Sequence, residues 1–563
     1  MPPTSLVPMS ASPRPWAARP RLAARDLFAA VALLALLALY VRAQLDLRGR
    51  PEEDAAMLLR YSQHLAAGQG IVWNLGEQPV DGATDFLFMV LVAALHRLGV
   101  PLETAARGIG LVAHAATVLL VSFGARRLYG AERRWALVPA VFVAVGPGLR
   151  HLAACYGTPL FTLAATAAWL LASVLAEASA GAEGGPALGF ALAALAMGLA
   201  RPEGVFLGGF MLIGVLLVRR GHGVLPIVVR YAIVFLTIGL SYFLWRWHYF
   251  GHPLPNPFYK KGAFVLHWHS LRMAWRDLWS LGLPFLALLP VGLLVRGGRR
   301  ATSFVLTPVV LFVGIWVLIS DETNYVGRFR YPIVPVLLIG CVPVAQAISR
   351  RLRGVWPSAG RLLATRGGRA AAWAGALALT LLLGWTEHRS YRYVAPSRMG
   401  LYDAALVLRD YAPRGFSLAT TEAGLLPLYS EWRAVDAWGL NAAHVARQGI
   451  DETYLDLFRP EVILVHAFFS PGVPHSGPRV ENRSLGPAWY RMTITLERYA
   501  QSRGYELAAC FGRNPWDTHY YYVRPGFPQS AEIVARLRAL DYYWDGEPTL
   551  DFAAEQRLTA GLR

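Results

Sequence analysis

The chain has 563 residues, of which 55% are hydrophobic and 16% carry a charge, and its formal net charge is +18. This composition is too apolar for an ordinary soluble enzyme and indicates an integral membrane protein. The three cysteines show no metal-ligand spacing and no disulfide framework. They are Cys155, Cys341 and Cys510.

The positive charge lies in short arginine runs between apolar segments, and this distribution argues against nucleic acid as the partner. Such runs are typical of cytoplasmic loops that face anionic lipid. They comprise Arg126, Arg127, Arg133 and Arg134, then Arg219 and Arg220, then Arg296, Arg299 and Arg300, and finally residues 350–369. The Arg-rich N-terminus, residues 1–26, is predicted to be cytoplasmic and to precede an uncleaved first span.

Apolar runs of membrane-spanning length recur along the first two thirds of the chain. We predict eleven spans, at about residues 27–44, 103–123, 135–150, 158–177, 186–200, 203–218, 229–246, 281–296, 302–320, 331–348 and 370–386. A further apolar segment, 84–98, covers only ~22 Å at ~1.5 Å per residue, short of the ~30 Å hydrocarbon core. We interpret it as a juxtamembrane helix on the outer surface.

With this topology every arginine run is cytoplasmic and the other polar segments gather outside. Residues 27–386 form the predicted membrane domain, whose first outer loop is 46–102, and residues 387–563 form an extracytoplasmic domain. A transporter would more often place polar groups near the membrane midplane. Because the predicted spans contain mainly Ala, Leu, Val and Gly there, we expect a one-sided active site.

Five carboxylates of the first outer loop are of interest here: Glu52, Glu53, Asp54, Asp81 and Asp85. Residues 52–67 have helical spacing, so the first three acids fall at a helix N-terminus, which favours negative charge. A carboxylate there can act as a general base toward an acceptor hydroxyl as a glycosyl bond forms. The alternative is that these acids only cap the helix. The Gly-, Asn- and Pro-rich run that follows predicts a shaped loop returning Asp81 and Asp85 to the membrane surface.

Residues 387–563 alternate helical and strand patterns and predict an α/β domain packed on the outer membrane face. The expected strands are Phe416–Thr420, Glu461–His466, Tyr505–Phe511 and His519–Val523. Aromatic side chains in this domain either stack on sugar rings of an acceptor or pack its core. They are Trp432, Trp438, Trp489, Trp516, Tyr520, Tyr521 and Tyr522.

The first outer loop resembles that of GT-C fold glycosyltransferases that use polyprenyl-phosphate sugars, above all the bacterial terminal arabinofuranosyltransferase-like subgroup. The matching residues are Glu53-Asp54-Ala55, Arg60-Tyr61, Gly68-Gln69-Gly70, Asn74 and Asp81-Gly82-Ala83-Thr84. Glu53 stands where the subgroup has Asp, and Asp81 where it has Glu. Both exchanges keep the charge and move the carboxylate by about one methylene.

Four later segments resemble the same family in the same order. They are the Arg201-Pro202-Glu203-Gly204 turn, the loop from Tyr249 to Lys261 containing Asn256, the Arg328-Phe329-Arg330-Tyr331-Pro332 entry to a late span, and the element from Val435 to Asn441. The resemblance therefore implies a polytopic α-helical membrane protein, GT-C-like, with about eleven spans, juxtamembrane helices and a C-terminal soluble α/β domain. It further implies a bacterial inner-membrane enzyme whose C-terminal domain is extracytoplasmic.

The implied reaction transfers a sugar from a polyprenyl-phosphate donor to an envelope glycan, lipid or protein acceptor on the extracytoplasmic face. Asp54 is the predicted base, with Glu53 supporting or sharing that role. Cations near the phosphate would stabilise the leaving group, and the candidates are Lys260, Lys261, Arg201, Arg328 and Arg330, which could instead snorkel to lipid head groups. The residues expected to position the substrate are Asp81, Asp85, Arg60, Asn74, Asn256 and Glu203.

No cofactor is required by this interpretation, although Asp321 and Glu322 could hold Mg²⁺ or Mn²⁺ together with the acids of the first outer loop. Two functions of other classes stay open. One is a flippase for lipid-linked saccharides, and the other is a non-enzymatic GT-C relative that acts in envelope assembly or motility.

Overall fold

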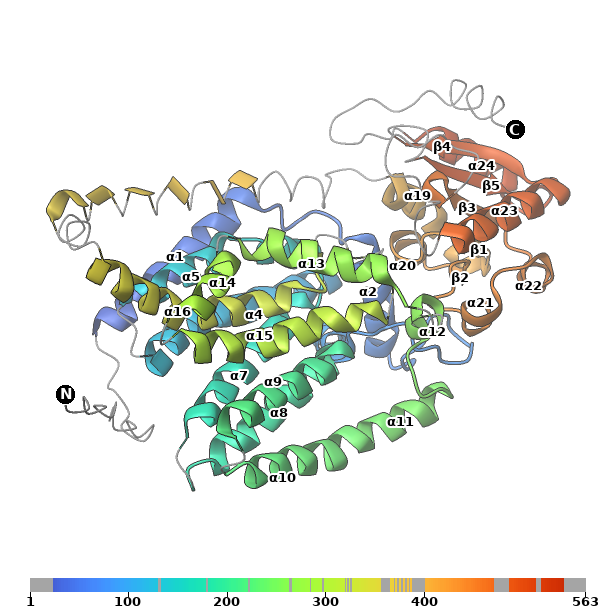
Figure 1. Ribbon diagram of the computed structural model, residues 1–563. Helices are drawn as coiled ribbons and strands as arrows, with labels where there is room; N and C mark the ends of the chain where they lie inside the picture. The colour runs from blue at the N-terminus through green and yellow to red at the C-terminus, as the bar shows by residue number, and fades with distance from the viewer. Residues whose placement is uncertain are drawn as a thin grey trace, which may run out of the picture.

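The computed structural model consists of a helical domain and a sheet-containing domain at one end of it (Figure 1). It describes residues 24–540 except for 130–132, 179–180, 221–222, 263–265, 284, 296–297, 319, 321–323, 325–326, 356–364, 470–485, 513–517 and most of 369–399.

The described helices of the first domain run from Ala24 to Val355. They are α1 (Ala24–Gln44), α2 (Glu53–Ala66), α3 (Phe86–Arg97), α4 (Leu102–Tyr129), α5 (Arg133–Val145), α6 (Gly148–Ala153), α7 (Thr158–Glu177), α8 (Gly184–Ala200), α9 (Glu203–Arg219), α10 (Leu225–Val234), α11 (Leu240–Phe250), α12 (Asn256–Gly262), α13 (Trp268–Gly282), α14 (Leu288–Leu294), α15 (Arg299–Gly314) and α16 (Val334–Val355). Short turns join several of them: η1 (Phe235–Gly239), η2 (Phe285–Ala287), η3 (Ile315–Val317) and η5 (Tyr331–Ile333).

Among the described residues, seven helical stretches are long and apolar enough to cross a membrane, or eight if the pair α13 and η2–α14, bent by 104°, is one span. These seven coincide with seven of the eleven predicted spans. Helices α8 and α9 have 17 residues each, about 25 Å at 1.5 Å per residue, slightly less than the hydrocarbon core. The predicted span 370–386 lies largely outside the described residues, so the count of eleven stays a prediction.

Small residues allow close packing of α7 with α4, α8 and α9 in the middle of the helical domain. Ala165, Ala168 and Ala172 of α7 are fully buried, and Trp169 stacks on Phe304 with the ring centroids 4.5 Å apart. Close contact between small side chains is a main source of helix association in membranes. Helix α3, with 12 residues, is too short to cross and packs beside α2 and α4.

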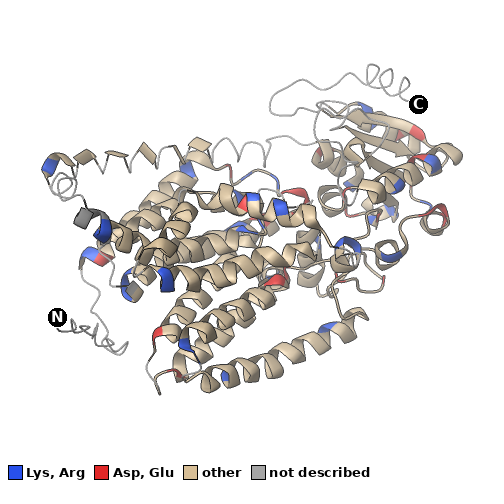
Figure 2. Cartoon of the chain, viewed as in Figure 1, with Lys and Arg blue, Asp and Glu red and all other residues tan. Residues whose placement is uncertain are grey.

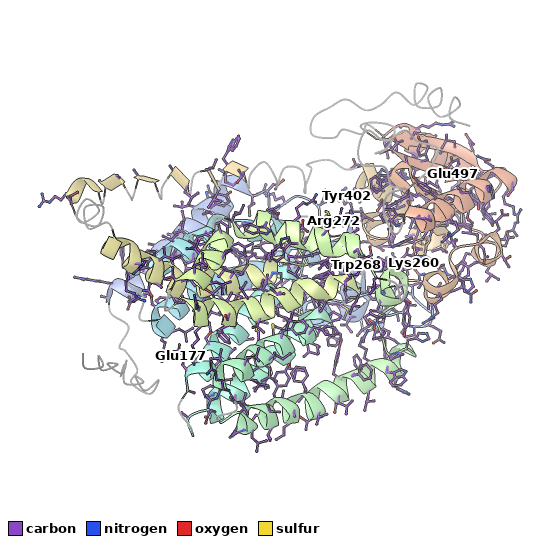
Figure 3. The ribbon with its side chains drawn as sticks, in the orientation of Figure 1. Glu177, Lys260, Trp268, Arg272, Tyr402 and Glu497 are labelled. Atoms are coloured by element: carbon purple, nitrogen blue, oxygen red, sulfur yellow. The ribbon has the colours of Figure 1, made fainter. Side chains whose placement is uncertain are left out.

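The end of the helical domain away from the sheet carries paired charges (Figure 2). Arg126 pairs with Asp26, and Arg219 pairs with Glu183 at 2.6 Å while donating to the carbonyl of Leu175. Two of the arginines that mark the predicted cytoplasmic face, Arg126 and Arg219, therefore also hold neighbouring helices together. Helix α7 ends at this same side with Glu177 (Figure 3).

The second domain holds a five-stranded mixed sheet between helices. Its elements are α19 (Gly400–Arg409), η6 (Ala412–Arg414), β1 (Ser417–Thr420), α20 (Leu425–Ser430), β2 (Arg433–Asp436), α21 (Ala443–Gln448), α22 (Glu452–Phe458), β3 (Val462–His466), η7 (Ala467–Phe469), α23 (Gly486–Ser502), β4 (Glu506–Phe511), β5 (His519–Val523) and α24 (Ser530–Arg538). The strand order is β2-β1-β3-β5-β4, with β1 parallel to β2 and β3, and β5 antiparallel to β3 and β4.

All four expected strands are present, and β2 is an additional one of only four residues. One face of the sheet packs against α19, α20 and α24 in a core that continues into α2 and the first outer loop. The opposite face packs against α22 and α23. Of the aromatic residues named in the sequence analysis, Trp516 lies outside the described residues. The other six lie in these two cores, and Trp432 is only 1% exposed. Their burial supports a role in core packing over stacking on sugar rings.

Candidate functional site

A pocket of about 270 Å³ lies where the first outer loop, the α8–α9 turn, α12 and the segment before α16 meet. Its polar lining comes from segments far apart in the sequence: Asp54, Thr84, Asp85, Tyr156, Arg201, Glu203, Lys261, Ser320 and Arg328. Its apolar lining includes Met57, Leu58, Phe206, Pro257, Phe258, Ile315, Trp316, Leu318, Phe329 and Leu440. The structure thus brings six of the predicted site residues into one cavity.

Asp54 lies in the first turn of α2, where Glu52 caps the helix by accepting from the Asp54 N–H at 2.9 Å. The carboxylate of Asp54 forms an ion pair with the buried guanidinium of Arg328. Burial alone would raise the pKa of Asp54, but Arg328, Lys261 and Arg201 together hold it below its usual value. Asp54 is therefore ionised at neutral pH and can accept a proton.

Tyr156 and Glu52 belong to the same cluster; from the sequence, Glu52 is singled out among the acids of the loop without an assigned role, and Tyr156 is not singled out. The Tyr156 hydroxyl donates to Glu52, and Arg328 lies over the tyrosine ring, 4.5 Å from its centroid. Burial, with the nearby charge of Asp54, raises the pKa of Glu52 to about 7. The clue to Tyr156 in the sequence was its position just after the outer end of the third predicted span. The structure shows that the chain turns sharply there, since Cys155 has a φ of 65°.

A second set of ion pairs is centred on Arg201 in the turn between α8 and α9. Its guanidinium contacts Asp85 at 2.5 Å and Glu203 at 2.6 Å and lies 5.0 Å from the Phe329 ring centroid. Burial raises the pKa of Asp85, while Arg201 opposes the shift. The turn needs glycine after Glu203, because a Cβ at Gly204 would lie 2.2 Å from the carbonyl oxygen of Met197.

The two lysines of the chain point to different places, although both were predicted to bind the donor phosphate. Lys261 lines the pocket, and burial lowers its pKa to about 8, although Asp54 opposes that shift. Lys260 instead has its ammonium 4.2 Å from the ring centroid of Trp438 and donates to the carbonyl of Val445 at 3.4 Å. Figure 3 places Lys260 at the junction with the sheet domain. Successive residues of a helix point about 100° apart, so the side chain of Lys260 leaves α12 in a different direction from that of Lys261.

Glu53 is also turned away from the pocket, toward the sheet domain. Its carboxylate accepts the backbone N–H groups of Gly424 at 2.5 Å and Leu425 at 2.9 Å, at the start of α20. Burial, with the charge of Glu422, raises the pKa of Glu53 well above its usual value. In the structure Glu53 therefore makes a contact between the two domains and is not part of the pocket lining, and its role in supporting Asp54 stays a prediction.

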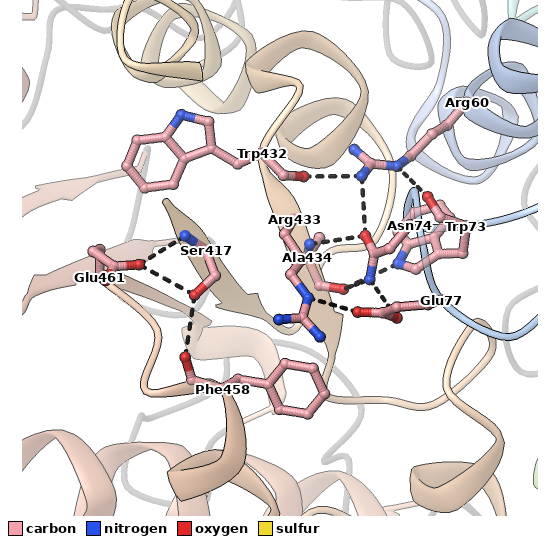
Figure 4. Close-up of polar contacts among 10 residues, drawn as sticks. All are labelled: Arg60, Trp73, Asn74, Glu77, Ser417, Trp432, Arg433, Ala434, Phe458 and Glu461. Carbon is pink, nitrogen blue, oxygen red and sulfur yellow. Dashed lines mark hydrogen bonds and ion pairs between the residues drawn. The ribbon is translucent and has the colours of Figure 1, made fainter. Parts of the chain in front are cut away.

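Two residues predicted to position substrate, Arg60 and Asn74, contact the sheet domain (Figure 4). Arg60 is buried and donates to the carbonyls of Trp73, Pro427 and Trp432. Asn74 donates to the Ala434 carbonyl at 2.9 Å and accepts from its N–H at 3.0 Å, which extends the edge of β2.

Asn256, a third residue predicted to position substrate, contacts the sheet domain in the segment that follows β2. Its amide donates to the carbonyls of Gly439 at 2.7 Å and Leu440 at 3.1 Å, and its N–H bonds the carbonyl of Asp81. The side chain of Asp81 pairs with Arg246, and burial raises its pKa to about 6. Asn256 and Asp81 thus brace the loop that brings Leu440 to the pocket.

Asp436 explains the shape of that loop. Its buried carboxylate accepts the N–H groups of Trp438, Gly439 and Asn441, and Asn441 in turn bonds the Tyr61 hydroxyl at 3.0 Å. The element predicted by resemblance is therefore a rigid turn between the sheet and the first outer loop.

Arg330, also named as a phosphate candidate, is fully buried over the ring of Trp316. Asp321 and Glu322 lie outside the described residues.

The fold is that of the GT-C glycosyltransferases. The structure is similar to ArnT from Cupriavidus metallidurans bound to undecaprenyl phosphate, with a TM-score of 0.54 and 14% identity over 89% of this chain and 98% of that one. It is also similar to the oligosaccharyltransferase AglB from Archaeoglobus fulgidus, in complex with an inhibitory peptide and a dolichol-phosphate. That match has a TM-score of 0.50 and 9% identity over 89% of this chain and 75% of that one.

Among curated proteins, the chain is 29% identical over 275 residues to the terminal β-(1→2)-arabinofuranosyltransferase of Mycobacterium tuberculosis. The match covers 46% of this chain and 42% of that relative. Residues 386–524 match a family model described as a domain of unknown function, DUF8728. The homologue and the structural neighbours are glycosyltransferases of the GT-C type, as the resemblance in the sequence implied.

Proposed function

We propose that this protein is a membrane glycosyltransferase that moves a sugar from a polyprenyl-phosphate donor to a glycan, lipid or protein acceptor on the extracytoplasmic face. The observation that carries the proposal is the placement of the Asp54 carboxylate in one pocket with Lys261, Arg201 and Arg328. The lipid phosphates bound by ArnT and AglB support a donor of this class.

In the proposed reaction the bond between the sugar C1 and the phosphate oxygen breaks, and a bond forms from the acceptor oxygen to C1. The departing phosphate gains negative charge, which the guanidinium and ammonium groups of the pocket stabilise. The proton of the acceptor hydroxyl goes to Asp54. Every group in this scheme lies in the lining of the same cavity.

The charges of the pocket suggest how donor binding and base activation are linked. Three carboxylates (Asp54, Asp85 and Glu203) balance three cations, so the phosphate must compete with an acid for a cation. In our proposal it replaces Asp54 as a partner of Arg328. Loss of that ion pair raises the pKa of Asp54, because the pair favours the charged form of the acid.

The apolar side of the pocket suits the prenyl chain of the donor. Phe206 and Leu318 line the pocket and are 53% and 54% exposed, so their rings and methyl groups can contact a hydrocarbon chain in the bilayer. Leu440 lines the pocket from the sheet domain, which would leave that side for the acceptor. The bilayer is thus the donor's route, and no nucleic acid enters the scheme.

The proposed reaction needs no divalent cation, because the side chains of the pocket supply the positive charge. Addition of Mg²⁺ or Mn²⁺ to protein treated with EDTA should leave turnover unchanged. Activity that EDTA abolishes and Mg²⁺ or Mn²⁺ restores would show that the cation considered from the sequence takes part.

The test measures release of free polyprenyl phosphate by the full chain in lipid, with a panel of polyprenyl-phosphate sugars and crude envelope glycan as acceptor. We expect release with one sugar, and a fall of about 10²- to 10⁴-fold in Asp54→Asn, the range typical of a lost general base. Asp46→Asn, an exposed acid of the same loop, is the matched control. No release from any donor by folded protein would favour the non-enzymatic alternative, and lipid movement without bond formation would favour a flippase.

A further inference from the structure

Three side chains with metal-binding atoms meet in the sheet domain, apart from the pocket lining. They are Glu422, His466 and His519, and one ligand atom of each lies within 4.8 Å of the others. His466 ends β3, His519 begins β5, and Glu422 follows β1. The cluster therefore gathers ligands from three neighbouring strands at one end of the sheet.

The pairing of the strands sets the two histidines side by side. His466 and His519 are direct partners in the antiparallel register of β3 and β5, and their rings stack with centroids 4.0 Å apart. Directly paired residues of antiparallel strands have Cβ atoms roughly 4.5–5.5 Å apart, on the same face. Two imidazoles at this spacing can bind one ion.

The loop that carries Glu422 is held by hydroxyl groups. Thr420 Oγ1 accepts the N–H of Glu422 at 2.9 Å and donates to its carbonyl at 2.7 Å. Thr421 Oγ1 accepts the N–H of His466 at 2.9 Å, which joins the loop to the end of β3. These bonds between threonine hydroxyls and the backbone hold Glu422 beside the histidines. In known metal sites the ligands are likewise oriented by hydrogen bonds from surrounding groups.

Two of the distances lie on either side of the value expected in a tetrahedral zinc site. Glu422 Oε1 lies 2.5 Å from His466 Nδ1 and 3.9 Å from His519 Nε2. Ligand bonds of about 2.0–2.1 Å at tetrahedral angles place ligand atoms about 3.3 Å apart, between these two values. To complete the site, the two distances would become equal and the two rings would turn from their 16° angle so that both face the ion.

The surroundings leave a ligand atom of His519 available. The Nε2 atom of His519 is buried and has no hydrogen-bond partner among the described residues. The rings of Phe468 and Phe469 lie 5.9 and 5.4 Å from that of His466 and form an apolar wall.

We propose that Glu422, His466 and His519 bind one first-row divalent metal ion, of which zinc fits best. Two imidazoles and a carboxylate are ligands that zinc favours, with a fourth position left for water. The ion would tie the ends of β1, β3 and β5 together. It would also fix the segment that leads from Glu422 to Gly424, whose N–H holds Glu53 of the first outer loop.

The test uses the full chain in detergent, purified with a tag that contains no histidine, freed of metal by a chelator and then titrated with Co²⁺. We expect the visible absorption of four-coordinate cobalt to saturate at one equivalent and to be displaced by Zn²⁺. Glu422→Gln and His519→Gln should each weaken binding by more than about 100-fold, because each removes a ligand, whereas loss of a supporting group alone costs about 10- to 100-fold.

His444→Gln is the matched control, since His444 lies in the same domain, is partly exposed and stacks on Tyr454. Glu422→Gln keeps the size of the side chain and can still bond His466, so it should fold. Zn²⁺ should raise the unfolding temperature of the wild type and of His444→Gln but not of the ligand variants. The proposal is overturned if the wild type binds no cobalt, or if both ligand variants bind it as tightly as His444→Gln does.

Discussion

Whether Arg60 contacts substrate or the sheet domain can be tested directly. Its guanidinium is buried and burial lowers its pKa to about 10, so it is charged at neutral pH. Two of its hydrogen bonds, to the carbonyls of Pro427 and Trp432, cross to the sheet domain. The perturbation we choose is Arg60→Met, which keeps the length of the side chain and removes its donors.

The expected cost follows from those two bonds. A hydrogen bond from a charged group contributes about 1.5–3 kcal/mol, which gives about 3–6 kcal/mol for two. Removing the buried charge also removes its desolvation cost, so the lower end, about 3 kcal/mol, is expected. Since 1.4 kcal/mol is a factor of ten, the junction should open about 150-fold more often.

Hydrogen exchange at the Ala434 amide reports this opening, because that N–H is held by Asn74 of the first outer loop. Arg433→Met is the matched control: Arg433 also bridges the two domains, to Glu77, but the side chains are 48% and 31% exposed. An exposed pair contributes at most about 1 kcal/mol, so exchange should rise by less than about 5-fold. If Arg60→Met exchanges like Arg433→Met and only raises KM for the donor, Arg60 contacts substrate and our interpretation of the junction is wrong.

Three further predictions concern the pocket and the helices that form it. Lys261→Met should lower kcat/KM for the donor by about 10² to 10³ through loss of a cation near the phosphate, whereas Lys260→Met should leave kcat/KM nearly unchanged; equal effects would refute the separation of the two lysines. Because the pKa of Glu52 is raised to about 7 in the folded protein, the protonated acid stabilises the fold at pH below about 4.5, and this contribution is lost as the pH rises through about 7. Thermal unfolding should therefore show wild type losing stability relative to Glu52→Gln across that window, and parallel curves would refute the shift. Gly204→Ala should lower the unfolding temperature, because its Cβ would lie 2.2 Å from a backbone oxygen, while Gly209→Ala on the same helix, with no atom within 4 Å, should not; equal midpoints would contradict the packing described for the turn.

Much of the architecture was predictable because the bilayer imposes length and polarity on each helix. Seven predicted spans coincide with helices of sufficient length, and the four predicted strands occur within one residue of their expected limits. Strand β2 was missed because four residues, beginning with the exposed Arg433, show no clear alternation. Asn74 stabilises that strand from more than three hundred positions away, which no local pattern reports.

The sequence by itself determined the class of fold, the acids of the first outer loop and the segments from which the pocket is built. It could do so because apolar length, charge type and turn residues are local properties. Only the tertiary structure decided which neighbour of each pair faces the pocket: Asp54 and Lys261 do, while Glu53 and Lys260 contact the sheet domain. Adjacent residues of a helix have the same neighbours in sequence, and the packing of a distant domain alone distinguishes their sides.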